Sequence, residues 1–187
     1  TTIGTLSHGI YLFTEAYNNS VYSNTITTSG SGGVAGVRFD KTAYNNSVYD
    51  NIINAPIGMY LVTTVYYNDI YRNNITIISG GSYGVWLDTT VYNNNIYSNN
   101  ITASGTRATG VYLLTAYNNS IYSNTMNVSA NGVFLNSPTT YNNKVYSNTI
   151  TTSENNGFGV YLLGTTVYGN NIYNNNITTI RLNADAI

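Results

Sequence analysis

Tyr17-Asn18-Asn19-Ser20-Val21-Tyr22-Ser23-Asn24-Thr25-Ile26 is the first of seven copies of one phrase in this chain of 187 residues. The copies begin at Tyr17, Tyr44, Tyr66, Tyr92, Tyr117, Tyr141 and Tyr168. Successive copies start 27, 22, 26, 25, 24 and 27 residues apart. A period of this size is typical of a solenoid, in which each unit buries its apolar face only against its neighbours.

A second, shorter phrase lies between the copies, as in Gly84-Val85-Trp86-Leu87. Apolar residues flank an aromatic residue with a period of two, which is the alternation of a β-strand. We expect Val85 and Leu87 to point inward and Trp86 to point outward. The pattern predicts one domain over residues 1–187, with coils that begin near Gly9, Gly36, Gly58, Gly84, Gly110, Gly132 and Gly159.

The long phrase contains a turn. Val21 and Ile26 are apolar in every copy and lie five residues apart, so a single strand cannot point both inward. We place the turn at Ser23-Asn24, because Asn tolerates the left-handed backbone conformation. Each coil then has three short strands, and stacked Asn amides can bond from coil to coil. The predicted Asn ladders are Asn19, Asn46, Asn68, Asn94, Asn119, Asn143 and Asn170, and Asn24, Asn51, Asn73, Asn99, Asn124, Asn148 and Asn175.

The pattern G-[IV]-x-L followed by N-x-[IV]-x-x-N-x-[IV] resembles the repeat of pectate-lyase-like right-handed parallel β-helices, and is especially similar to the NosD-type repeat. The resemblance implies an all-β fold: a right-handed parallel β-helix of about seven coils, with three strands per coil. That superfamily includes polysaccharide lyases, glycoside hydrolases, phage tailspikes, adhesins and non-enzymatic surface proteins, so the resemblance predicts fold more sharply than activity.

The composition excludes several classes of protein. Charged residues are 7% of the chain and the formal net charge is −1, which argues against binding nucleic acid or an anionic membrane surface. The sequence has no apolar run long enough for a transmembrane helix. Cysteine is absent, so disulfides and thiolate metal sites are excluded. So few charges leave little repulsion between copies of the chain, which favours self-association.

No catalytic constellation stands out. Asp40 and Asp88 share a column near a bend, where we expect solvated turn residues, and Asp50 stacks under Arg72 as a surface ion pair. The resemblance to lyases would call for a Ca²⁺ site of several acids with a basic residue, and neither cluster is present. A copper site of the NosD type would need His, Met or Cys ligands; His8 stands alone and the two Met residues fall at core positions. We predict no catalytic residue, no metal, no cofactor and no enzyme.

Aromatic residues form columns instead. An outward stripe, suited to association or to glycan binding, is predicted from Tyr11, Tyr60, Trp86, Tyr112, Phe134 and Tyr161, with Arg38 in the same column. A second outward column is Tyr22, Tyr49, Tyr71, Tyr97, Tyr122, Tyr146 and Tyr173. The facing of the Tyr17 column is left open. The simplest interpretation is that stacked rings stabilise the solenoid, with about 0.5 to 1.5 kcal/mol per neighbouring pair.

The strand after the turn carries outward Thr and Asn residues, such as Thr25 and Thr27, which resembles the Thr-x-Thr arrays of ice-binding β-helices. Asn often replaces Thr, and Ile52 interrupts one column. Sequons for N-glycosylation in an exported protein begin at Asn18, Asn45, Asn74, Asn100, Asn118, Asn127 and Asn176.

The ends of the chain have no recognisable cap. Thr1–Leu6 is expected to form more coil, and 178–187 has no amphipathic helical pattern. Either caps lie outside this sequence or neighbouring molecules cover the open edges head to tail.

The sequence therefore predicts a non-enzymatic structural protein, extracellular or at the cell surface, whose partner is itself. We expect end-to-end association into a filament, sheath or coat. The alternative is a carbohydrate-binding or carbohydrate-active domain of a larger surface protein, with polysaccharide as its partner; ice binding comes third. No nucleic-acid partner and no transmembrane segment are expected.

Overall fold

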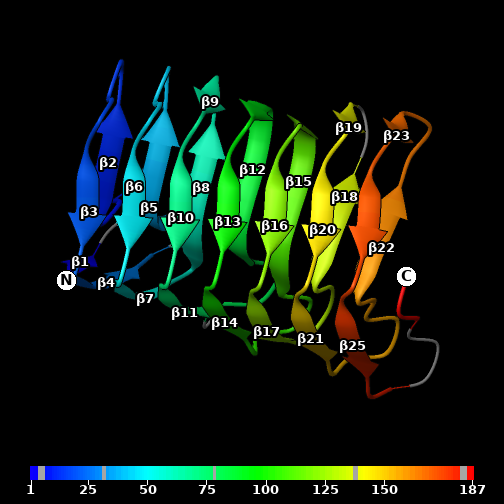
Figure 1. The fold of residues 1–187 in the computed structure, drawn as a ribbon. Coiled ribbons are helices and arrows are strands. Elements are labelled where there is room, and N and C mark those ends of the chain that lie inside the picture. The colour runs from blue at the N-terminus through cyan, green and yellow to red at the C-terminus, as the bar shows by residue number, and fades with distance from the viewer. Residues whose placement is uncertain (4–6, 31–32, 78, 137–138, 182–184) are drawn as a thin grey trace.

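The computed structural model describes residues 1–3, 7–30, 33–77, 79–136, 139–181 and 185–187. These residues form a right-handed parallel β-helix with three strands in each coil (Figure 1). Every strand pairing is parallel and joins one coil to the next. The predicted all-β fold is confirmed, and the described residues contain no helix.

The strands form three sheets, named A, B and C here, and each coil runs through sheet B, then sheet C, then sheet A. Sheet A contains β1 (Thr2–Ile3), β4 (Thr25–Ser29), β7 (Ile52–Ala55), β11 (Asn74–Ile77), β14 (Asn100–Ala103), β17 (Thr125–Val128), β21 (Thr149–Thr152) and β25 (Asn176–Thr179). Sheet C contains β3 (Ser20–Tyr22), β6 (Ser47–Tyr49), β10 (Asp69–Tyr71), β13 (Asn95–Tyr97), β16 (Ser120–Tyr122), β20 (Lys144–Tyr146) and β24 (Asn171–Tyr173).

Sheet B carries the short Gly-containing phrase. Its main path is β2 (Ile10–Phe13), β5 (Ala35–Asp40), β8 (Ile57–Val62), β12 (Tyr83–Tyr92), β15 (Thr109–Tyr117), β18 (Val133–Asn136) and β22 (Val160–Leu163). The short strands β9 (Val65–Tyr66), β19 (Thr140–Tyr141) and β23 (Val167–Tyr168) extend it at the corner before sheet C. At the N-terminus β1 pairs with β4, as the expected extra coil requires. Gly4–Leu6 of that expected coil lie outside the described residues, and so do Ser31 and Gly32, which belong to the Gly/Ser-rich loop of residues 29–33.

The core is a single column of apolar side chains enclosed by the three sheets. Val85 and Leu87 are fully buried and Trp86 is partly exposed, as the alternation predicts. The inward residues pair with their own kind from coil to coil: Ile70 lies opposite Ile96, and Ile75 opposite Ile101. Burial of each such side chain contributes about 1.5 to 3 kcal/mol, and stacking provides that burial.

Both predicted Asn ladders are present and continuous over seven coils. Asn94 lies in the middle of the first and is completely buried. Its Oδ1 accepts from the backbone N–H and the Nδ2 of Asn68, both at 2.9 Å, and its own Nδ2 donates to Oδ1 of Asn119 at 3.1 Å. The same Nδ2 also donates to the carbonyls of Val65 and Tyr92 at 3.0 Å. Each ladder amide therefore satisfies backbone groups that the corner would otherwise leave buried and unpaired.

The left-handed residue at each corner is not the ladder Asn but the residue before it. Ser23 has φ 56° and Ser98 has φ 54°, and the residue before the other ladder is also left-handed, as at Asn93 with φ 55°. The expectation that Asn24 itself takes this conformation is wrong. The backbone N–H and the side-chain amide of a ladder Asn both donate to the same oxygen of the next coil, as Asn24 does to Asn51 at 3.0 Å. Because these two bonds fix the ladder Asn itself, the bend falls at the residue before it.

The Gly residue at the start of each sheet B strand is required by close packing. A Cβ on Gly84 would lie 2.5 Å from Cγ2 of Ile101 and 2.6 Å from the carbonyl oxygen of Gly110. The same pair of neighbours, a sheet A side chain and the next coil's Gly carbonyl, surrounds Gly36 and Gly132. The Gly column therefore lets sheets A and B meet at a sharp corner.

We expect Asn94→Ala to lower the free energy of unfolding by about 3 kcal/mol or more, because it removes several buried hydrogen bonds and leaves the backbone N–H of Asn68 without its acceptor. Urea denaturation measures the effect. Asn100→Ala is the control: its side chain is exposed and its bond to Asn74 spans 3.3 Å, so we expect a change within about 0.5 kcal/mol. Equal losses in the two variants would contradict the ladder as the chief stabilising element.

Candidate functional site

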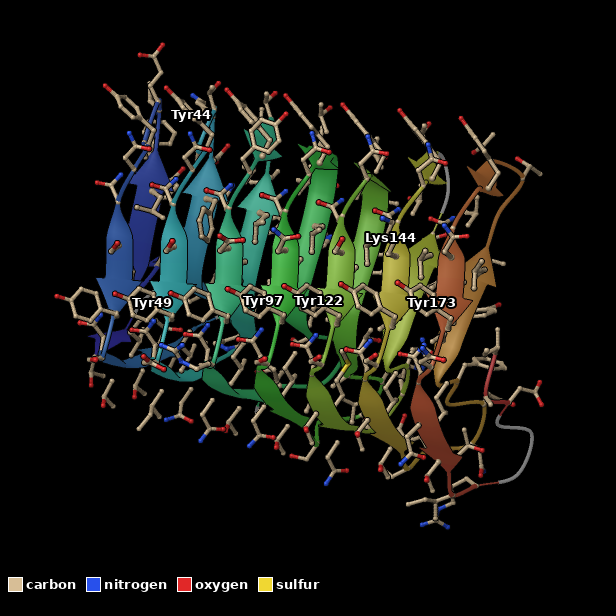
Figure 2. All side chains as sticks on the ribbon, in the orientation of Figure 1. Tyr44, Tyr49, Tyr97, Tyr122, Lys144 and Tyr173 are labelled. Carbon is tan, nitrogen blue, oxygen red and sulfur yellow. The ribbon has the colours of Figure 1, made fainter. Side chains whose placement is uncertain are left out.

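Two tyrosine columns form regular ladders along the outside of the solenoid. In the sheet C column, neighbouring ring centroids are 4.9 to 5.1 Å apart and neighbouring planes differ by 2 to 8°. Figure 2 shows Tyr49, Tyr97, Tyr122 and Tyr173 in this row. The column that begins at Tyr17, whose facing the sequence left open, also points outward and stacks with centroids 4.9 to 5.2 Å apart.

Stacking of this regularity has a chemical consequence. A sugar binds an aromatic residue over the face of its ring, and inside a ladder both faces of each ring are covered by its neighbours. Tyr97, for example, lies parallel to Tyr71 on one side and to Tyr122 on the other, 4.9 Å from each. The ladders therefore present ring edges and hydroxyl groups, and we assign them a stabilising role.

The aromatic stripe on sheet B departs from this regularity. Tyr60 and Trp86 stack at 4.4 Å, but the planes of Trp86 and Tyr112 differ by 43° at 6.1 Å. Tyr83 enters at this break and stacks on Tyr112 at 4.7 Å, with its plane tilted 52° from Trp86. Trp86 and Tyr83 remain partly exposed at this break, whereas Tyr112 is only 8% exposed.

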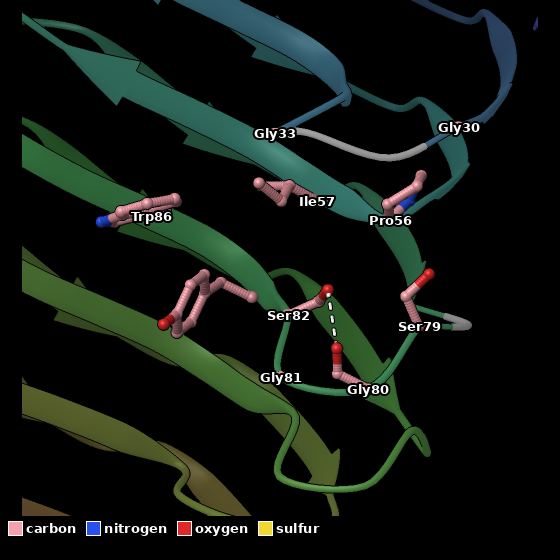
Figure 3. Close-up of a pocket in the computed structure, with 10 residues that line it drawn as sticks. Gly30, Gly33, Pro56, Ile57, Ser79, Gly80, Gly81, Ser82 and Trp86 are labelled. Atoms are coloured by element: carbon pink, nitrogen blue, oxygen red, sulfur yellow. Dashed lines mark hydrogen bonds between the residues drawn. The ribbon is translucent and has the colours of Figure 1, made fainter. Parts of the chain in front are cut away.

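Two clefts lie on the two sides of this break, over sheet B and its bordering loops. The first has a volume of about 440 Å³ and is lined by Gly30, Gly33, Pro56, Ile57, Ser79, Gly80, Gly81, Ser82, Tyr83 and Trp86, all uncharged (Figure 3). Figure 3 shows Trp86 and Ile57 on neighbouring strands, with the loop from Ser79 to Ser82 along one side. Ser82 Oγ donates to the carbonyl of Gly80 across that loop at 3.4 Å.

The second cleft has a volume of about 450 Å³ and is more polar. It is lined by Gly81, Tyr83, Arg107, Thr109, Ala130, Asn131, Phe134, Glu154, Asn155 and Asn156. The backbone N–H of Arg107 donates to Oε2 of Glu154 at 3.0 Å, which joins loops that are two coils apart. Gly81 and Tyr83 line both clefts, so the two form one groove along the solenoid with Tyr83 between them.

Sequence reasoning missed this groove. The predicted stripe supplies only Trp86 and Phe134 to the clefts; most of the lining comes from the Gly/Ser-rich loops and from the residue before each corner Gly. The signal was present in Tyr83, an aromatic residue directly before Gly84 where most other coils have a smaller or polar residue.

Two phenols of the stripe donate to carboxylates. Tyr60 donates to Oδ2 of Asp88 at 2.9 Å, and Tyr11 donates to Oδ2 of Asp40 at 3.0 Å. Arg38 Nη2 also lies 2.9 Å from Oδ2 of Asp40. Asp40 is only 7% exposed, so the expectation of a solvated turn residue is wrong for it: the phenol and guanidinium satisfy a carboxylate that the sheet has taken out of water.

His8 lies beside this cluster. Its ring contacts Tyr11 edge-on at 5.3 Å, and its Nδ1 accepts from the backbone N–H of Ala35 at 3.1 Å. Burial lowers the pKa of His8, and the charge of Arg38 lowers it further. The imidazole is therefore neutral at neutral pH and, with Nδ1 engaged, has its N–H on Nε2. Tyr11 contacts this ring and donates its phenol hydrogen bond to Asp40, so the three residues form a cluster at the first two coils of sheet B.

The remaining predicted residues lie elsewhere on the surface. Asp50 and Arg72 form the expected ion pair, with a second hydrogen bond from Nε to Oδ1 at 2.8 Å. Ile52 is 48% exposed and interrupts the outward Thr and Asn face of sheet A; ice binding stays a prediction that thermal hysteresis would test. All seven sequon asparagines are exposed, so glycosylation also stays a prediction.

Comparisons with known proteins agree with the fold. A scan against protein-family models and a search of curated proteins found no match. Among solved structures, the chain is similar to a double mutant of the periplasmic alginate epimerase AlgG, with a TM-score of 0.58 and 14% sequence identity. The match covers 93% of this chain and 48% of that one, so this chain spans about half the length of that epimerase. At this identity the likeness shows the fold alone: a right-handed parallel β-helix of the pectate-lyase-like class.

The same comparison corrects one expectation. The sequence predicted a protein that is not an enzyme, and this prediction is contradicted because the solved structure that shares the fold is that of an epimerase. The low charge and the absence of a sequence motif are therefore poor grounds for excluding catalysis on this fold.

The described residues contain no helix that is long and apolar enough to span a membrane.

We expect the protein to lose stability at alkaline pH. Burial raises the pKa of Tyr60, and its hydrogen bond to Asp88 raises it further; burial raises the pKa of Tyr83 and Tyr97 as well. A phenol with a raised pKa keeps its proton longer in the folded state, so the free energy of unfolding falls as pH rises above the unfolded pKa of about 10.

Urea midpoints measured between about pH 8 and pH 12 test this expectation. Tyr60→Phe removes one of the titrating groups and should flatten the decline. A midpoint that stays constant above pH ~10 would show that these phenols ionise equally in the folded and unfolded chain.

Proposed function

We propose that the protein binds a neutral linear polysaccharide in the groove over sheet B. The observation that carries this proposal is the break in aromatic stacking at Trp86, Tyr83 and Tyr112, directly between two clefts. The partly exposed rings of Trp86 and Tyr83, beside Ser, Thr and Asn side chains, suit the two kinds of group on a sugar, apolar C–H faces and hydroxyls.

The charges of the groove favour a neutral ligand. The first cleft is lined by uncharged residues, and the second has one cation and one anion, Arg107 and Glu154. A polyanion would need a basic surface along its length. The stripe beyond the clefts is also balanced locally, since Arg38 pairs with Asp40.

The comparison adds support of a general kind. The similar solved structure is named as an alginate epimerase, so a β-helix of this class acts on a polysaccharide, and it is periplasmic. By extension we propose that this chain works outside the cytoplasm, at the cell surface or beyond it. The proposal concerns binding.

We expect Trp86→Ala to abolish or greatly weaken binding, because it removes the ring that lines the first cleft. The measurement is affinity electrophoresis against a panel of soluble neutral polysaccharides (β-glucan, mannan, galactomannan and xylan) and of polyuronates. Tyr122→Ala is the matched control, since it removes a ring of the sheet C ladder, away from the groove, and should leave binding unchanged.

Two results would count against the proposal. Absence of retardation across the whole panel for the unaltered protein would exclude polysaccharide binding of useful strength. Equal loss of binding in the Trp86 and Tyr122 variants would place the binding surface outside the groove or indicate a general loss of structure, which circular dichroism would separate.

Self-association is a second candidate, favoured by the two continuous tyrosine ladders and a net charge of only −1. Such a surface offers stacked hydroxyls with little repulsion between copies. We propose that copies of the chain associate, end to end or side by side, into a filament, sheath or coat.

Electron microscopy and sedimentation velocity of the native protein test this second proposal. Regular fibres or sheets, with Tyr97→Lys and Tyr122→Lys reducing lateral association, are the expected result. A monomer at all accessible concentrations would exclude it and leave polysaccharide binding unaffected.

A further inference from the structure

We infer that the groove consists of two adjoining subsites, divided by Tyr83, and that it accommodates a neutral glycan extended along the solenoid axis. This inference rests on the proposed polysaccharide binding and adds the direction of the chain and the spacing at which it is recognised.

The evidence is a column of residues on sheet B that lies next to the aromatic stripe. One residue per coil precedes the corner Gly, and in-register pairs such as Ala35 with Ile57 and Tyr83 with Thr109 place these residues in one row. The row is His8, Ala35, Ile57, Tyr83, Thr109, Asn131 and Phe158. Planar ring side chains occur in its first, fourth and seventh coils, with non-aromatic residues between them.

Each ring of this row packs against the stripe residue of its own coil. His8 contacts Tyr11 at 5.3 Å, Tyr83 contacts Trp86 at 4.9 Å, and Phe158 contacts Tyr161 at 4.5 Å, all between ring centroids. Of these three rings, Tyr83 lines both clefts, whereas His8 and Phe158 line neither.

The two clefts lie on either side of Tyr83. The first is lined by residues of the second, third and fourth coils, from Gly30 to Trp86, and the second by residues of the fourth to seventh coils, from Gly81 to Asn156. Their volumes, about 440 and 450 Å³, are nearly equal. Tyr83 belongs to both, so it divides two similar spaces.

The number of coils that a cleft spans sets the length of ligand that it can hold. Adjacent coils are about 4.8 Å apart, so three coils advance by roughly 14 Å. A pyranose residue in an extended chain advances by about the height of one coil, so each subsite spans roughly three sugars. A glycan along the axis would therefore pass through both subsites, whereas a glycan across the coils would meet one of them.

The test uses the neutral polysaccharide that binds in the panel above, partially hydrolysed and separated into fractions of roughly two to eight sugars. Affinity is measured by calorimetry for each fraction. We expect two rises: one that is complete at about three sugars, and a second, of about tenfold or more, when the oligosaccharide becomes long enough to reach both subsites. A single smooth rise or a single step would overturn the two-subsite arrangement.

Variants separate the two subsites. Asn131→Phe places a ring in the row within the second cleft and should remove the second rise while leaving the first. Tyr83→Ala removes the divider and should merge the two rises into one. Thr125→Phe, on the exposed face of sheet A, is the control and should change neither. Should Asn131→Phe fail to fold, the length series and Tyr83→Ala still decide.

The outcomes distinguish this inference from the proposed function. If no polysaccharide of the panel binds, both fail together. If a polysaccharide binds through Trp86 but affinity rises in one step, or Asn131→Phe leaves both rises intact, the proposed function stands and the two-subsite arrangement is wrong.

Discussion

The amide-to-amide hydrogen bond between ladder asparagines fixes the geometry on which everything else depends. Its oxygen receives both the backbone and the side-chain N–H of the coil before, as Asn94 does from Asn68, so each corner has one permitted position relative to the next. The register that results places like residues above like residues. Tyrosine rings then stack about one strand spacing apart, and apolar side chains form a continuous core, because the backbone leaves them no other neighbours.

Such strict repetition opposes the construction of a binding site. A surface in which every coil is the same gives a ligand no preferred position, and the tyrosine ladders cover their own ring faces. The groove arises where the repetition fails: Tyr83 displaces the stacking of Trp86 on Tyr112, and loops of unequal length border sheet B. The proposed function therefore depends on the few residues that depart from the repeat.

Repetition also explains what could be predicted from the sequence. The Asn ladders, the inward Val85 and Leu87 and the outward Trp86 follow from the period and the alternation alone. All seven copies of the repeat show the same pattern. The conformation of Ser23 and the burial of Asp40 did not follow, because they depend on hydrogen bonds between coils that one phrase does not reveal. The clefts were missed because their lining comes from loops without a shared pattern, and the exclusion of catalysis was unsafe because an enzyme has the same fold.

The direction of the bonds between coils has a mechanical consequence. Both ladders and all three sheets are hydrogen-bonded along the solenoid axis, so a force applied along that axis pulls in line with every one of them. The bonds at the end coil bear the load first, and coils should peel away singly at low force, each releasing a length set by its own loop. A force across the axis would instead load many coils at once. The protein should therefore be compliant when stretched lengthwise and stiff when sheared, whatever it binds.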